Sequence, residues 1–212
     1  QIIEAALDEF SKKDFFTASF NNIIKRAGIS KGSMYHYFHD KEDLYMYILE
    51  MGIEEKRKFL SKCLKKLDKP MEEMGFWELL HFQLQASIDF GLENPMLMKL
   101  NDMMEQLEKM SNQKFKNKIK DRLGIELESY MADMIEKAVA NGEIRNDFDR
   151  DFVWRLFRFM FINFRQFLPE TDRLLKQDSD RLKREFQQLL DFIKNGLQPQ
   201  KPFGKGKAGK YD

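Results

Sequence analysis

The chain of 212 residues is poor in the residues that build β-sheets. Valine and threonine together occur only at Thr17, Val139, Val153 and Thr171, and no stretch keeps the alternation of apolar and polar residues that a strand needs. The five prolines stand at positions 70, 95, 169, 199 and 202, which leaves long windows open to helix. Phenylalanine and methionine, with 20 and 13 copies, supply much of the apolar content. We therefore predict an all-α protein.

Several classes of function lack the residues that they need. The single cysteine, Cys63, excludes an internal disulfide framework and fits a reducing compartment, so we expect a cytoplasmic protein. With one cysteine and three histidines we expect no metal, and nothing in the sequence predicts a cofactor or an enzyme. No uncharged run reaches the roughly 18 residues of a membrane helix, so we expect no membrane partner. The 36 basic and 35 acidic residues give a net charge of +1, and any binding to nucleic acid must come from a local patch.

Short helices with recognisable ends make up the first part of the chain. Residues 1–13 place apolar side chains three or four positions apart, the spacing of an amphipathic helix. Ser19, Ser30 and Asp40 stand where helix N-caps belong, because their side chains can accept a backbone N–H of the first turn. Gly28 can adopt the left-handed conformation that ends a helix. The pattern predicts helices over 1–13, 20–27, 31–38 and 41–67.

The rest of the chain favours longer helices. The composition shifts toward methionine and phenylalanine after Pro70, and Asn94-Pro95 is typical of a helix start. Residues 198–212 contain two prolines, three glycines and four lysines, which predicts a flexible tail. Helices are predicted over 74–92, 95–109, 113–141, 149–168 and 178–195. We expect three parts, 1–46, 47–197 and 198–212, with the first boundary inside a continuous helix.

The segment between the second and third predicted helices has the features of a helix-turn-helix. Ala27-Gly28-Ile29-Ser30 can form the tight turn, and the helix that follows can enter the major groove of DNA. The charge agrees, because residues 12–41 hold six basic and two acidic side chains on an otherwise neutral chain. The order A-G-I-S-x-G-x-x-Y-x-Y-F-x-x-K-E-x-L, from Ala27 to Leu44, is specific as a combination. With the earlier positions Ala6, Leu7, Phe10, Phe15, Ser19 and Ile23, it resembles the TetR family of bacterial transcriptional regulators.

The resemblance implies which residues contact double-stranded DNA. The start of the helix at 31–38 would meet base edges, and Lys31 could donate to guanine. The tyrosines that follow would contact phosphate or sugar, although Tyr35, Tyr37 and Phe38 could instead pack the core of the three helices. The implied set is Ser19, Lys31, Gly32, Ser33, Tyr35, His36, Tyr37 and Lys41.

A homodimer is expected from the C-terminal helices. The helix at 152–168 is apolar on most of its circumference, with Arg155, Arg158 and Arg165 gathered on one side, so it needs a cover on two sides. The helix at 178–195 adds an apolar seam, and two such helices from each protomer make the four-helix interface that the family uses. The predicted interface is Leu156, Phe159, Met160, Phe164, Leu182, Phe186, Leu189 and Ile193. A monomer with a thick core is the alternative.

The middle helices are rich in methionine and aromatic residues, which suit a pocket of irregular shape. The resemblance implies a small-molecule effector of apolar or amphipathic character. Ordinary core packing is the better explanation for any single methionine among them. Trp77 and His81 are candidates for the polar groups of the pocket, and an exposed or core role explains them equally well. The predicted pocket residues are Trp77, Leu80, His81, Leu84, Met103, Met104, Met131, Met134 and Phe157.

These features predict a ligand-responsive regulator, a repressor in most of the family, that binds a palindromic operator as a homodimer. The helix at 41–67 would be the lever that couples effector to DNA. The alternative is a helical protein–protein interaction module that has lost operator binding. Its support is Asp14, where the family usually has glycine, and Ala18, where threonine is common. We expect Asp14 to need a left-handed conformation.

Overall fold

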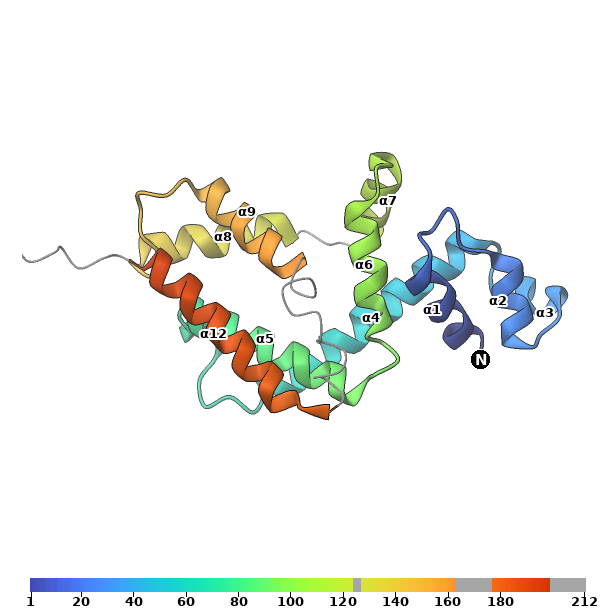
Figure 1. Ribbon diagram of the computed structural model, residues 1–212, viewed down its shortest axis with the longest axis horizontal. Coiled ribbons are helices and arrows are strands. Elements are labelled where there is room, and N and C mark those ends of the chain that lie inside the picture. The colour runs from blue at the N-terminus through green and yellow to red at the C-terminus, as the bar shows by residue number, and fades with distance from the viewer. Residues whose placement is uncertain (124–126, 163–176, 199–212) are drawn as a thin grey trace, which may run out of the picture.

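The computed structural model describes residues 1–123, 127–162 and 177–198, and every regular element within them is a helix (Figure 1). The all-α prediction is confirmed. The elements are α1 (Ile2–Lys12), α2 (Phe20–Ala27), α3 (Lys31–Tyr37), α4 (Lys41–Leu64), the 3₁₀ turn η1 (Met71–Glu73), α5 (Phe76–Glu93), α6 (Lys99–Lys109), α7 (Gln113–Leu123), α8 (Leu127–Ala140), α9 (Arg150–Ile162) and α12 (Ser179–Leu197).

The ends of the first helices follow the predicted signals. The Ser19 hydroxyl accepts the N–H of Asn22 at 3.3 Å, and the Ser30 hydroxyl accepts that of Ser33 at 3.0 Å. Gly28 has φ of 66°, the left-handed conformation that ends α2. Because each signal needs only residues within one turn, the local sequence is enough to place α2 and α3.

The core of the N-terminal helices continues into two later helices. Phe10 of α1 and Met34 of α3 are fully buried, and Phe10 meets Tyr45 of α4 edge to face at 4.9 Å. Burial raises the pKa of the Tyr45 hydroxyl. We name the following buried set, with the helices α1–α4, α6 and α7 that carry it, the proximal core: Leu7, Phe10, Ile23, Met34, Leu44, Tyr45, Met103, Leu107, Phe115 and Ile119. Figure 1 shows α6 and α7 standing beside α1 and α4.

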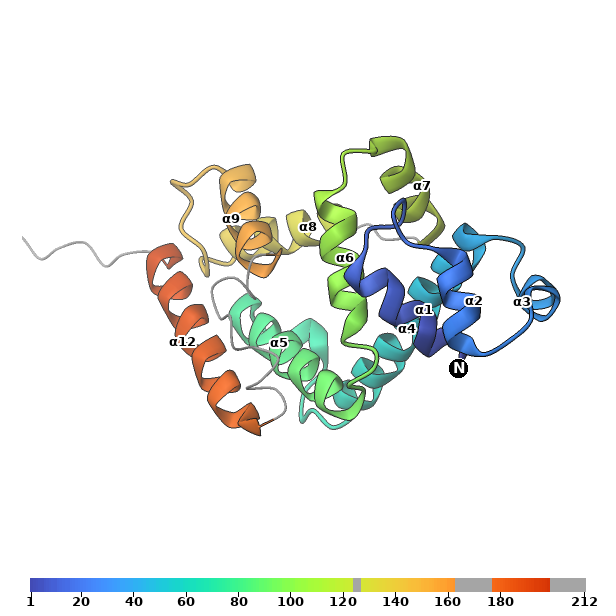
Figure 2. The same cartoon turned by 45° about the vertical axis from the view of Figure 1, so that its right-hand side comes forward.

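A second core lies at the other end of the molecule. Figure 2 shows α8, α9, α12 and the first part of α5 gathered there. We call its buried residues the distal core: Phe76, Trp77, Leu80, Ile135, Ala138, Ile144, Val153, Phe157, Leu190, Ile193 and Leu197. The helix α5 joins the two cores, because its last turns carry Phe90, which meets Phe59 of α4 with ring centroids 5.5 Å apart.

Two predicted helices differ from the observed ones, and parts of two other predicted segments cannot be compared. The helix expected from residue 95 begins at Lys99, because the N–H of Leu97 bonds to the carbonyl of Asn94 and that of Leu100 to Leu97, which makes tight turns first. The single helix predicted over 113–141 is wrong: α7 packs in the proximal core and α8 in the distal core. The end of the helix predicted over 149–168 and nearly all of the tail at 198–212 lie outside the described residues.

Candidate DNA-binding site

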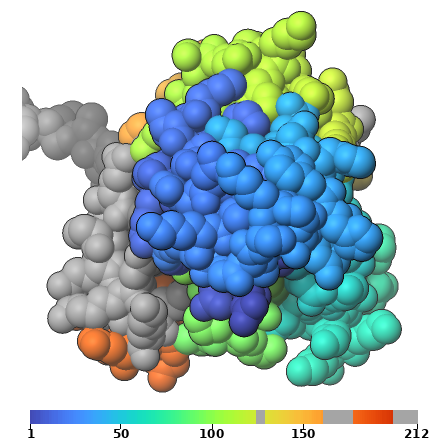
Figure 3. Space-filling model, turned by 90° about the vertical axis from the view of Figure 1, so that its right-hand side faces the viewer, coloured from blue at the N-terminus to red at the C-terminus, as the bar shows by residue number. Residues whose placement is uncertain are grey.

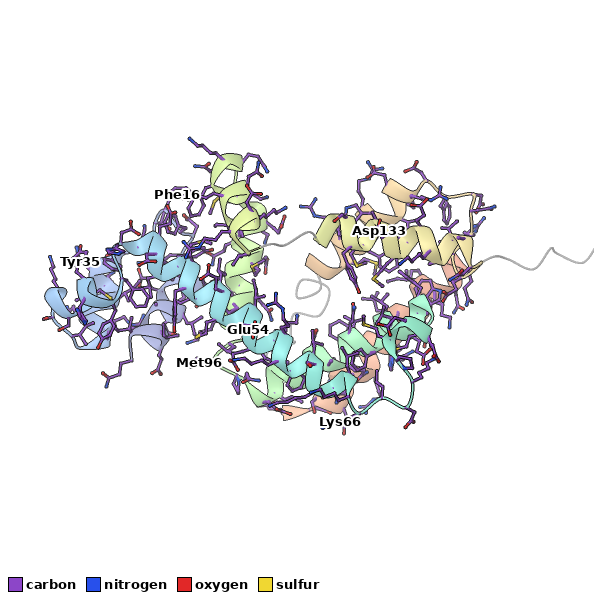
Figure 4. The ribbon with its side chains drawn as sticks, turned by 180° about the vertical axis from the view of Figure 1, so that it is seen from behind. Phe16, Tyr35, Glu54, Lys66, Met96 and Asp133 are labelled. Carbon is purple, nitrogen blue, oxygen red and sulfur yellow. The ribbon has the colours of Figure 1, made fainter. Side chains whose placement is uncertain are left out.

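The exposed face of α3 carries most of the predicted DNA contacts. Only Met34 of this helix is buried, and it anchors α3 to the proximal core. Tyr35 is 54% exposed and Tyr37 65% exposed, whereas Phe38 is half-buried against the core. The remaining exposed residues of the helix are Lys31, Gly32, Ser33 and His36. Figure 3 looks onto this end, where the blue N-terminal helices form the surface, and Figure 4 places Tyr35 far from Lys66 and Asp133.

The first turn of α3 is held in a fixed shape by its own residues. The hydroxyls of Ser30 and Ser33 lie 2.9 Å apart, so Ser33 is engaged with the cap. A Cβ placed on Gly32 would meet only the Ser30 hydroxyl oxygen, at 3.8 Å. Because Gly32 is exposed and has no side chain, another surface can approach the backbone of this turn closely, with Lys31 beside it.

Lys41 is occupied with the turn between α1 and α2. Its ammonium donates to the carbonyls of Ala18 at 2.8 Å and Phe16 at 3.2 Å, and it lies 4.7 Å from the centroid of the Phe15 ring. Burial lowers the pKa of Lys41, against an opposing pull from Asp14. Two of its three N–H donors therefore bind backbone carbonyls, which leaves one for another acceptor. The phosphate contact by Lys41 stays a prediction.

Glu9 supports the start of α2 from beneath. Its carboxylate accepts the backbone N–H of Ser19 at 3.1 Å and the ammonium of Lys13 at 2.8 Å, and the residue is only 5% exposed. Burial raises the pKa of this carboxyl, but the hydrogen bonds from Lys13 and Ser19 outweigh it and hold the pKa below its usual value. Glu9 therefore fixes Ser19 at the place where α2 begins.

The expectation that Asp14 needs a left-handed conformation is wrong. Among the described residues only Gly28 and Gly142 have positive φ. The Asp14 carboxylate instead accepts the backbone N–H groups of Phe16 at 2.8 Å and Thr17 at 3.2 Å and the Thr17 hydroxyl at 2.7 Å. The hydrogen bond from the Thr17 hydroxyl is the main reason that the pKa of Asp14 is lowered. The aspartate thus builds the turn by a side-chain route, as Asx-turns do.

Sequence reasoning did not assign roles to the outer face of α2. Asn21 and Asn22 are exposed there, and Lys25 is exposed one turn later. Because the first helix of a helix-turn-helix crosses the DNA backbone, these side chains lie where phosphate contacts are made. Arg26 on the same face forms an ion pair with Asp8 of α1. The signal was available, because polar residues at positions 21, 22, 25 and 26 leave Ile23, Ile24 and Ala27 as the buried face.

The predicted dimer residues divide into two groups. Leu182 and Ile193 are 1% and 6% exposed because they pack within the same chain, Leu182 against Ile88 of α5 and Ile193 in the distal core. The seam of α12 is therefore covered within the same chain at these two positions, and their place in a dimer interface stays a prediction. Phe159 is 65% exposed, and Phe192, which was not predicted, is 78% exposed. Leu156, Met160, Phe186 and Leu189 are half-buried, and Phe164 lies outside the described residues.

The predicted effector-pocket residues do not form one site. Trp77, Leu80, Leu84, Met134 and Phe157 come together in the distal core or against it. Met103 and Met104 pack in the proximal core, because α6 turns that face toward α1. Met131 is buried on α8, and His81 is exposed. An open pocket of about 500 Å³ lies between α4 and the end of α5, where its lining of charged and polar residues with Phe59 and Phe90 includes none of the predicted residues.

Two other features are absent from the described residues. No group of three or more histidine, cysteine, aspartate or glutamate side chains there could hold a metal ion. No helix among them is both long and apolar enough to cross a membrane.

A helix-turn-helix that exposes its second helix, joined to a helical domain, defines a class of DNA-binding transcriptional regulators. Residues 2–48 match the family described as "Bacterial regulatory proteins, tetR family". Residues 2–48 therefore form a DNA-binding domain of the TetR family, and the protein is a DNA-binding transcriptional regulator.

Known relatives agree with this assignment. A TetR family transcriptional regulator from Chloroflexus aurantiacus J-10-FL has a similar structure, with a TM-score of 0.71 and 27% identity over 94% of this chain and 92% of that one. The HTH-type transcriptional regulator YfiR of Bacillus subtilis is 32% identical over 77 residues, which cover 36% of this chain and 34% of that protein. The fatty acid metabolism regulator protein of Bacillus subtilis is 25% identical over 150 residues, 70% of this chain and 72% of that protein.

Proposed function

We propose that this protein is a ligand-responsive repressor that binds a palindromic operator as a homodimer. The observation that carries the proposal is the exposed face of α3, held by the Ser30 cap and anchored by Met34. With α3 in the major groove, Lys31 donates to guanine and Tyr35 and His36 meet the backbone or base edges. Lys25 on α2 adds a contact to phosphate.

Dimerisation is supported by the apolar surface that the distal helices leave exposed. Phe159 of α9 and Phe192 of α12 are large apolar side chains that are mostly exposed. Other residues of the same two helices are buried in the distal core. Two copies that bury these faces against each other about a two-fold axis form an isologous interface. Such a dimer presents two copies of α3 to two half-sites one helical turn apart, which is what a palindromic operator needs.

The effector of the proposal is a small apolar or amphipathic molecule. Support comes from the methionine and aromatic residues of α5, α8 and α9 in and around the distal core, where Trp77, Met134 and Phe157 lie together. One relative is named the fatty acid metabolism regulator protein of Bacillus subtilis, and fatty acids are amphipathic molecules with long apolar chains. We call α1–α3 with the first half of α4 the DNA-binding head. An effector that binds more tightly to a form of the dimer with a different separation of its two heads would release DNA.

Selection from random DNA duplexes tests the DNA-binding part. The purified protein should enrich a palindromic sequence, with an affinity that falls steeply with salt because phosphate contacts release counterions. Lys31→Ala and Tyr35→Ala should each weaken binding to that sequence by about tenfold and leave the dimer intact. Lys114→Ala, which removes an exposed lysine from α7, is the matched control and should bind as the unchanged protein does. Failure to enrich any sequence would favour the interaction module instead.

A further inference from the structure

An ion pair between α6 and α9 links the proximal core to the distal core. The guanidinium of Arg158 on α9 donates to the carboxylate of Glu108 on α6 at 2.6 Å. Around Arg158, α9 buries Val153 and Phe157 in the distal core, whereas α6 buries Met103 and Leu107 in the proximal core. This ion pair therefore adds a second link between the proximal and distal bodies, the helices that carry the two cores, to the one that α5 makes.

The Glu108 carboxylate is firmly anchored on the proximal side. Two ammonium groups of α7 lie near it, that of Lys116 at 3.6 Å and that of Lys120 at 3.8 Å, and Lys116 also donates to the carbonyl of Glu108 at 2.7 Å. Burial raises the pKa of Glu108, but the hydrogen bond from Arg158 and the nearby lysines outweigh it and hold the pKa below its usual value. Glu108 thus stays anionic and fixed, ready to hold the guanidinium of the other body.

The helix that carries Glu108 is attached to the DNA-binding head at two places. The side-chain amide of Gln106 donates to the carbonyl of Ser11, at the end of α1, at 2.8 Å. Lys99, at the first residue of α6, pairs with Asp8, whose other oxygen pairs with Arg26 of α2. A displacement of α6 must therefore carry α1 and α2 with it, and α3 follows α2 through the turn at Gly28.

We propose that Arg158 is a positioning residue for DNA recognition: its ion pair with Glu108 sets the angle of each head relative to the distal body. The inference rests on the proposed dimer, in which the distal bodies of two protomers meet and the heads reach the half-sites. The angle then fixes the separation of the two α3 helices. A surface ion pair without this role would contribute little, because such pairs are screened by water and salt.

The first test measures how strictly the spacing of half-sites is read. The palindrome selected by the unchanged protein is compared with versions that carry one or two extra base pairs at the centre. The unchanged protein should bind the lengthened duplexes about tenfold more weakly, and Arg158→Gln should reduce that penalty to about twofold. Arg158→Lys keeps a cation at the site and should restore part of the penalty.

Arg155→Gln is the matched control. It removes the same group from the same helix one turn earlier, where Arg155 pairs with Asp151 of its own helix at 3.0 Å. It should keep the full spacing penalty, because its ion pair joins no other element. The double variant Glu108→Gln with Arg158→Gln should show no further loss of the spacing penalty beyond Arg158→Gln alone, since both changes break the contact between α6 and α9.

A second measurement needs no DNA. With Cys63→Ser to remove the native thiol, a spin label on Glu4→Cys, an exposed position of α1, reports the distance between the two heads of a dimer. Arg158→Gln should broaden the distribution of distances, and Arg155→Gln should leave it unchanged. If Arg158→Gln leaves both the distance distribution and the spacing penalty unchanged, the positioning role of Arg158 is overturned and the proposed function stands. A protein that enriches no duplex, or whose labels report no dimer, overturns the proposed function and the positioning role with it.

Discussion

The regions around the proximal and distal cores differ in the side chains that lie on their surfaces. In the proximal region, charged side chains from α6 and α7 pair with the head: Lys99 with Asp8, Lys118 with Glu42, and Arg122 with Glu50. In the distal region, Phe159 and Phe192 remain in solvent. The proximal region is therefore a body that includes two helices from later in the chain, whereas the distal region leaves large apolar side chains exposed. The head is not a separate unit that ends at α4.

The largest effect is expected from removing a side chain through which α6 completes the head. Met103 is fully buried in the proximal core. Met103→Ala should lower the free energy of unfolding by about 3 kcal/mol, because a buried methionine leaves a cavity, and it should increase hydrogen exchange in α1 and α4. Met131→Ala makes the same change on α8, where Met131 is also buried, and should spare the amides of α1. Equal protection of α1 in both variants would show that α6 is not part of the head's core.

A smaller effect, dependent on pH, is expected at Glu9. Its folded pKa is lowered, so its contribution to stability is present above the ordinary carboxyl range of about 4 and is lost as the pH falls through the folded value. Glu9→Gln should cost about 2 kcal/mol at pH 7, because the charge-assisted hydrogen bonds to Ser19 and Lys13 are lost. Urea unfolding at pH 7 and at pH 3 should show the gap between the two proteins shrinking at the lower pH. The control is Glu136→Gln, an exposed carboxylate of distal α8, and a gap of constant size would contradict the assignment.

The sequence predicted those features that depend on neighbours along the chain. Ser19, Gly28 and Ser30 are where they were expected, because a cap or a left-handed turn is decided within about four residues. The exposure of Tyr35 and Tyr37 follows once Met34 is fixed as the buried residue of α3.

Features that depend on which surface covers an apolar face could not be predicted in the same way. The spacing of Leu182 and Ile193 shows that one side of α12 is apolar, but the same spacing serves a partner's helix or α5 of the same chain. Met103 reads as a pocket residue for the same reason, until the packing of α6 against α1 is known. For Lys41, the acceptors are backbone carbonyls, which any sequence provides.

The smallest expected effect compares the same substitution in the two regions. Gly28 and Gly142 both end helices in the left-handed conformation, with φ of 66° and 72°, and a Cβ on either would meet nothing within 4 Å. Gly28→Ala and Gly142→Ala should therefore each cost about 1 kcal/mol from backbone strain alone, measured by thermal unfolding. Only Gly28 lies between α2 and α3, so only Gly28→Ala should also weaken binding to the selected duplex, by several-fold, as the strained turn lets α3 shift against α2. If both variants lost the same DNA affinity, the turn at Gly142 would affect the position of α3 as much as the turn at Gly28 does. The proximal and distal regions would then not be separate in their effect on DNA binding.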